Sequence, residues 1–179
     1  MIGGRSPRFA SLVVVLVAAC GSRNDEMSVH GVRVVLKTSA PFTRSADFPA
    51  RLENTVDAAL QFWDGRWDAL AGTTIVLDNE QYLSCGSSSS HALGCFDGSN
   101  IHVTTRDPTI GTWLCVEQTV LVHEIGHAII GDPMHDDPRW MDFMPVFREL
   151  QGRDGYDANG GVVPCQLYLN VWWHALHRP

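Results

Sequence analysis

The sequence predicts an α+β fold, in which a small mixed sheet carries a long helix and a second, apolar helix, followed by a short and mostly irregular C-terminal part. Three observations predict it. Short β-branched segments alternate with stretches in which apolar residues recur at helical spacing. An apolar run without Gly or Pro precedes the pattern His123-Glu124-Ile125-Gly126-His127. The chain has 179 residues, which is the length of one domain.

The N-terminal residues 1–19 are predicted to be a lipoprotein signal peptide. Arg5 and Arg8 give a positive start, and the apolar run over residues 9–19 is too short to span a membrane comfortably. Small residues lead directly into Cys20, which resembles a bacterial lipobox. The resemblance implies cleavage before this cysteine and attachment of lipid to it. The alternative is an ordinary signal peptide that leaves an odd thiol.

The predicted lipid determines the rest of the domain plan. Residues 20–28 are short and polar and are expected to form a lipid-anchored tether, and residues 29–179 are expected to form the folded domain. Ser22 is not the aspartate that resembles an inner-membrane retention signal. We therefore expect the protein in the bacterial cell envelope, held in the outer membrane by the lipid on Cys20.

The first half of the domain is predicted from its hydrophobic pattern. Residues 29–36 alternate in part and are β-branched, which predicts a strand. Residues 48–70 carry apolar side chains at helical spacing and predict an amphipathic helix packed on the sheet. Residues 73–77 and 100–105 are predicted strands. Residues 84–98 between them are rich in Gly and Ser and are predicted to be a loop.

The second half is predicted to contain the helix that bears the histidine pattern, over residues 111–130. Gly131 and the proline that follows it are typical of a helix C-terminus. A loop then leads to an irregular Gly/Asp-rich stretch at residues 152–161, and residues 164–177 are predicted to form a closing helix.

The cysteines other than Cys20 are expected to form disulfides, because the envelope is oxidising. Four cysteines allow three connectivities. We favour Cys85–Cys95, which closes a short loop, and Cys115–Cys165, which ties the histidine-bearing helix to the C-terminal part. The alternative is a four-cysteine zinc site, which the wide spacing and the lack of a Cys-Xaa-Xaa-Cys pair disfavour.

The histidine pattern itself predicts a zinc site. His123 and His127 are four residues apart, so on a helix they lie on one face and can hold one Zn²⁺ ion. Glu124 is placed to act as a general base on a metal-bound water. Catalytic zinc usually has a third protein ligand. His135 is the preferred third ligand, and two carboxylates are kept as alternatives, namely Asp132 and Glu149.

This region resembles the metzincin metallopeptidases, and its matrixin branch most. Their pattern is His-Glu-Xaa-Xaa-His-Xaa-Xaa-Gly-Xaa-Xaa-His, followed by a methionine in a tight turn beneath the metal. Here Gly131 follows the second histidine by four residues, where the family has three, and His135 follows by eight, where the family has six. The resemblance implies a zincin-like fold and a turn methionine, either Met141 or Met144. It also implies that the strand segment at residues 101–105 is the sheet edge that pairs with an extended peptide substrate.

These observations predict a zinc-dependent endopeptidase that acts on a peptide or protein substrate. The formal charge of −7, with 13 basic and 20 acidic residues, argues against nucleic acid as a partner, and we expect a monomer. Two alternatives stay open. One is a non-catalytic zinc-binding envelope lipoprotein, against which Glu124 speaks. The other is a disulfide-stapled interaction module in which the motif is accidental.

Overall fold

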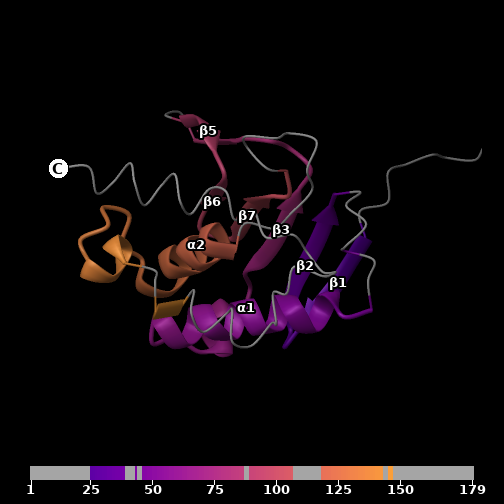
Figure 1. The fold of residues 1–179 in the computed structure, drawn as a ribbon, viewed down its shortest axis with the longest axis horizontal. Coiled ribbons are helices and arrows are strands. Elements are labelled where there is room, and N and C mark those ends of the chain that lie inside the picture. The colour runs from indigo at the N-terminus through magenta and orange to yellow at the C-terminus, as the bar shows by residue number, and fades with distance from the viewer. Residues whose placement is uncertain are drawn as a thin grey trace, which may run out of the picture.

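The computed structural model describes residues 25–38, 43, 46–86, 89–106, 118–142 and 145–146. In this part of the chain the fold is α+β, with a mixed five-stranded sheet, a two-stranded hairpin and two α-helices (Figure 1). The strands are β1 (Asp25–Val29), β2 (Val32–Lys37), β3 (Thr74–Asp78), β4 (Leu83–Cys85), β5 (Ser89–Ala92), β6 (Gly94–Phe96) and β7 (Asn100–Thr104). The α-helices are α1 (Phe48–Phe62) and α2 (Gln118–Ile130), and the 3-10 helices are η2 (Trp67–Leu70) and η3 (Pro138–Met141).

The main sheet has the order β1-β2-β3-β7-β6. β2, β3 and β7 run parallel, and the strands at both ends of this order are antiparallel to their neighbours. The parallel register aligns alternating apolar residues into rows across the sheet. One row contains Val34, Ile75 and Ile101, and the neighbouring row contains Leu36, Leu77 and Val103.

One hydrophobic core joins these rows to both helices. Leu52 and Val56 of α1 and Leu121 and Ile125 of α2 belong to the same buried cluster as the strand residues. Each of these four side chains is at most 4% exposed. Both helices therefore pack on the same face of the sheet, and the contact with the core fixes the orientation of α2 and of the histidines that it carries.

The N-terminal strand differs from the prediction. The segment expected to be one strand at residues 29–36 is instead split by a tight turn, in which His30 and Gly31 have φ of 48° and 84°. Two left-handed residues in a row are typical of a hairpin turn whose twist matches that of its strands. β1 consequently begins at Asp25, inside the predicted tether at residues 20–28.

The long helix is shorter than predicted. α1 ends at Phe62, because Asp64 adopts φ of 56° and the chain turns away from the helix axis. The last part of the range 48–70 forms η2 instead. The turn also brings Gly65 against Ile129 of α2, whose side-chain atoms lie 3.0–3.1 Å from where a Cβ would be.

The prediction of a loop over residues 84–98 is wrong, because this stretch contains the hairpin β4–β5 and strand β6. The predicted disulfide Cys85–Cys95 is confirmed, and it ties β4 to β6. β6 also changes the role of β7. β7 is hydrogen-bonded to β3 on one side and to β6 on the other, so the prediction that residues 101–105 form the substrate edge is wrong.

Several predictions lie outside the described residues. These are the lipidation of Cys20, the pair Cys115–Cys165, the start of the histidine-bearing helix before Gln118, and the closing helix at residues 164–177. Among the residues that are described, no helix is long and apolar enough to cross a membrane.

Candidate metal centre

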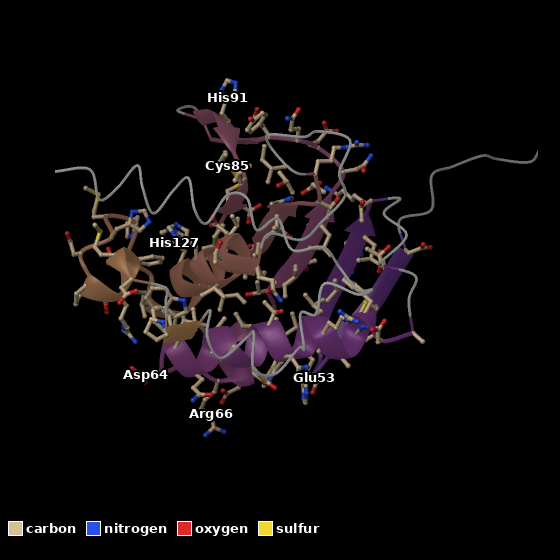
Figure 2. All side chains as sticks on the ribbon, viewed as in Figure 1. Glu53, Asp64, Arg66, Cys85, His91 and His127 are labelled. Atoms are coloured by element: carbon tan, nitrogen blue, oxygen red, sulfur yellow. A yellow bond between two sulfur atoms is a disulfide. The ribbon has the colours of Figure 1, made fainter. Side chains whose placement is uncertain are left out.

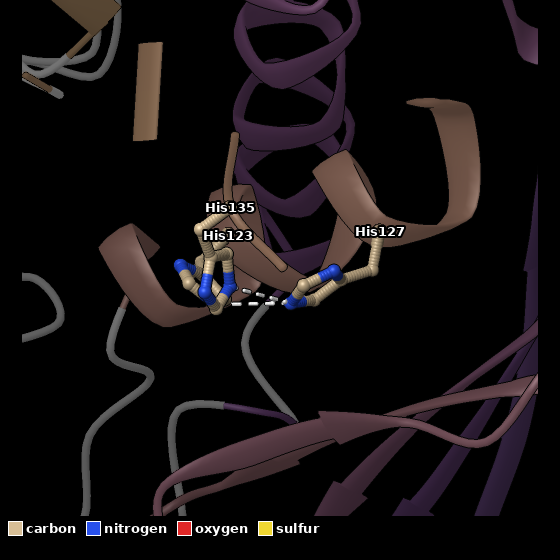
Figure 3. Close-up of side chains that lie close together, drawn as sticks. All are labelled: His123, His127 and His135. Atoms are coloured by element: carbon tan, nitrogen blue, oxygen red, sulfur yellow. Dashed lines mark hydrogen bonds between the residues drawn. The ribbon is translucent and has the colours of Figure 1, made fainter. Parts of the chain in front are cut away.

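Three histidines converge at the end of α2. His123 and His127 project from neighbouring turns of that helix, and His135 reaches them from the loop that follows (Figure 3). Their Nε2 atoms form a nearly equilateral triangle with sides of 3.2, 3.2 and 3.1 Å. Three nitrogens bound to one tetrahedral Zn²⁺ at ~2.05 Å would lie about 3.3 Å apart. The triangle therefore fits three ligands of one ion and leaves a fourth position for water or substrate.

Two left-handed residues bring the third histidine into place. Gly131 ends α2 with φ of 61°, and its N–H donates to the carbonyl of His127 at 3.1 Å. His135 itself has φ of 60°, which turns its side chain back toward the helix. The loop thus accommodates the wider spacing between the second and third histidines without displacing the third from the other two.

The protonation of His123 and His127 suits a cation. The Nδ1 of His127 donates to the carbonyl oxygen of Asp132 at 3.1 Å, which leaves a lone pair on Nε2. Burial, together with the neighbouring His127 and His135, lowers the pKa of His123 to about 3. Burial also lowers the pKa of His127. Neutral imidazoles whose lone pairs face one another repel, and a bound cation removes that repulsion.

Glu124 lies between α2 and the sheet edge β6. It is 6% exposed, and its Cγ would be 2.8 Å from a Cβ placed on Gly94, so only glycine fits at that strand position. Burial raises the pKa of the Glu124 carboxyl to about 7, against a hydrogen bond from the Phe96 backbone that lowers it. A carboxylate with a pKa near neutrality can both accept and return a proton near pH 7.

The raised pKa of Glu124 predicts a pH dependence of stability for the metal-free protein. Between pH 4.5 and about 7 the folded chain holds this proton and the unfolded chain does not, so stability falls as pH rises. The loss is about 3 kcal/mol across that window. The free energy of unfolding of Glu124→Gln, measured in urea, should therefore equal that of the chelator-treated parent at pH 4 and be larger than it at pH 8. An equal difference at both pH values would contradict the buried carboxyl.

Asp132 does not join the three histidines, although it was the main alternative ligand. Its Oδ1 accepts from the Met134 N–H at 3.1 Å. Its Oδ2 accepts from the Asp137 N–H at 3.0 Å and from the indole N–H of Trp140 at 2.9 Å. Both oxygens are thus used within the loop, and the other alternative, Glu149, lies outside the described residues.

Sequence reasoning missed Trp140. Its ring lies 4.8, 4.6 and 4.6 Å from the rings of His123, His127 and His135, measured between centroids. The only signal in the sequence is a large aromatic residue in a loop otherwise rich in Asp and Pro. Of the two predicted turn methionines, Met141 is 61% exposed and Met144 lies outside the described residues.

The histidine of the β4–β5 hairpin is remote from this site. His91 lies on the hairpin strand β5, well apart from His127 in Figure 2, and its ring contacts Tyr82. Cys85 of the disulfide, also labelled in Figure 2, ends β4 and pairs with Ser89 of β5 in the same hairpin.

Gly126, in the middle of the histidine pattern, allows two tryptophans to pack on α2. A Cβ on this residue would lie 2.6 Å from Cε2 of Trp63 and 2.7 Å from Cη2 of Trp140. Alanine usually stabilises a helix interior relative to glycine, but here we expect Gly126→Ala to destabilise the fold by about 1–3 kcal/mol through overpacking. Urea unfolding would measure this, and the cost should shrink in a Trp140→Phe background. A stabilised Gly126→Ala protein would contradict the packing.

Comparison of the chain with protein-family models, with curated proteins and with solved structures gave no significant match.

Proposed function

We propose that this chain is a zinc-dependent endopeptidase with a zincin-like fold of the metzincin type. The observation that carries the proposal is the triangle of Nε2 atoms from His123, His127 and His135, whose sides of 3.1–3.2 Å suit one tetrahedral ion. A purely structural zinc site usually has four protein ligands. Three converging histidines next to a buried glutamate favour a catalytic one.

The reaction divides between the ion and Glu124. A bound Zn²⁺ ion supplies Lewis acidity, which makes a water molecule acidic and polarises a carbonyl. Glu124 takes the proton from the attacking water and returns it to the leaving amine. Its position between α2 and β6, with a pKa raised to about 7, supports both steps.

β6 is the strand that best suits an extended peptide. It ends the order of the main sheet, and its residue Gly94 touches Glu124. A peptide added to a free sheet edge gains main-chain hydrogen bonds that do not depend on its side chains. We therefore propose that β6, and not residues 101–105, pairs with the substrate.

The location is proposed from the N-terminal sequence. We propose a lipid on Cys20 and an outer-membrane position in the bacterial envelope, with Cys115 and Cys165 as a second disulfide. Because β1 begins at Asp25, only a few residues separate the proposed lipid from the fold. An extended chain rises at most ~3.5 Å per residue, so the sheet would lie close to the membrane surface.

The test is metal content together with peptide cleavage, measured on the full chain in detergent. We expect one zinc per chain and cleavage of a peptide library, followed by mass spectrometry. Chelation should stop cleavage, and returning zinc should restore it. A folded chain without stoichiometric metal would overturn the proposal, and a zinc-loaded chain that cleaves no peptide would favour a non-catalytic zinc-binding lipoprotein.

A further inference from the structure

We propose that Trp140 is a positioning residue of the metal centre. Its ring packs against all three histidines and is called the floor of the site below, and a hydrogen bond to Asp132 holds it in place. This inference rests on the proposed function. It assigns to a tryptophan the place beneath the metal that the resemblance gave to Met141 or Met144. It also explains how a loop with an unusual spacing can deliver a third ligand.

The contacts of the Trp140 ring with the three imidazoles are the first support for this proposal. The Trp140 ring lies within 4.8 Å of every one of the three imidazoles, centroid to centroid, in tilted or edge-to-face orientations. The imidazoles lie 4.8–4.9 Å from one another, so each touches the other two and the indole. Aromatic pairs at such distances are mutually attractive. The indole therefore restricts the rotation of all three rings and holds their Nε2 atoms toward one point.

The hydrogen bonds of Asp132, which hold Trp140 in place, are the second support. Its indole N–H donates to Oδ2 of Asp132 at 2.9 Å. The carbonyl of the same Asp132 accepts from Nδ1 of His127, and its carboxylate also accepts the backbone N–H groups of Met134 and Asp137. A single residue thus links the floor, one ligand and the loop on both sides of His135.

The packing of Trp140 on Trp63 is the third support. Its ring lies 4.4 Å from that of Trp63, and the residue as a whole is 7% exposed. Trp63 is in turn fixed to α2, because its indole N–H donates to the carbonyl of Val122 at 2.8 Å. The floor is therefore attached to the helix that carries the first two ligands, and it cannot shift without moving core residues.

η3, which carries Trp140, is also tied to α1. Arg139 donates to the Phe62 carbonyl at 3.1 Å and to the Asp64 carboxylate at 3.0 Å. It also donates to both oxygens of Asp137, the residue that precedes η3. The C-terminal end of α1 and the left-handed Asp64 therefore help to fix the position of Trp140 relative to the histidines.

The experiment measures metal binding, not hydrolysis. Zn²⁺ affinity of the full chain is measured by competition with a chromophoric chelator, and the visible spectrum of bound Co²⁺ reports the ligand geometry. The variants are Trp140→Ala, which removes the floor, and Trp140→Phe, which keeps a ring but removes the indole N–H. Trp67→Phe is the matched control, because Trp67 stacks on His30 and bonds to Asp57 instead.

We expect Trp140→Ala to weaken Zn²⁺ binding by about 10- to 100-fold, the range found when groups that orient metal ligands are removed. Trp140→Phe should weaken it by about tenfold at most and shift the Co²⁺ spectrum, and Trp67→Phe should do neither. If Trp140→Ala does not fold, the Trp140→Phe spectrum decides.

Two results would overturn the proposal, and they are distinguishable. Folded Trp140 variants that keep the affinity and the Co²⁺ spectrum of the parent would show that the indole only fills the core, and the proposed function would stand. A parent that binds neither metal would overturn this inference and the proposed function together.

Discussion

Glu124→Gln should abolish peptide cleavage while the protein keeps one zinc per chain. The glutamine has nearly the same shape and can still accept the Phe96 N–H, but it cannot take a proton from water. General acid–base groups contribute about 10²- to 10⁴-fold, so kcat/KM should fall by at least ~100-fold. Steady-state cleavage of the best library peptide, beside metal analysis, would measure this.

The matched control is Glu53→Gln, the same change on α1. Glu53 is partly exposed and pairs with His30 at 2.6 Å, and Figure 2 shows it on the far side of α1 from His127. It should leave cleavage unchanged. Cleavage by Glu124→Gln within about tenfold of the parent would show that another group is the base. Loss of zinc from that variant would show that Glu124 serves the metal instead.

The parts of the fold that could be predicted are those with a strong local pattern. β3 and β7 lie within one residue of their predicted ranges, because runs of β-branched residues buried in a parallel sheet have no competing period. The hairpin turn at His30 was missed, because a left-handed histidine is not a usual turn signal. β4 and β5 contain Ser and lack a hydrophobic pattern, and β6 is only three residues long, so the sequence pattern did not predict these strands.

The candidate site divides in the same way. His123, Glu124 and His127 follow from helical spacing, which is local. The part of their support that depends on contacts between distant segments could not be predicted. Besides its hydrogen bond to Asp132 in the same loop, Trp140 packs on Trp63, and the neighbouring Arg139 is bonded to Asp64, 75 residues earlier. No spacing within the loop encodes that contact.

His135→Ala should nearly eliminate zinc binding at the concentrations where the parent is saturated. The variant keeps two ligands on α2, and a catalytic site needs three. Because removing an outer-shell partner already costs ~10- to 100-fold, loss of a ligand should weaken binding by more than about 100-fold. His127→Ala should behave alike, and chelator competition would measure both.

The control is His91→Ala, since His91 lies on β5 and contacts Tyr82. It should bind zinc as the parent does. Zinc lost in His127→Ala but kept in His135→Ala would contradict the three-histidine site and move the third ligand elsewhere, with Glu149 the next residue to replace. His135 has a left-handed backbone and follows a glycine that also has one, so its approach to the other two requires a particular loop conformation. The Asp132 carboxylate holds the loop in that conformation through the N–H groups of Met134 and Asp137. A third metal ligand requires such a fixed loop, whereas a histidine that is only solvated does not.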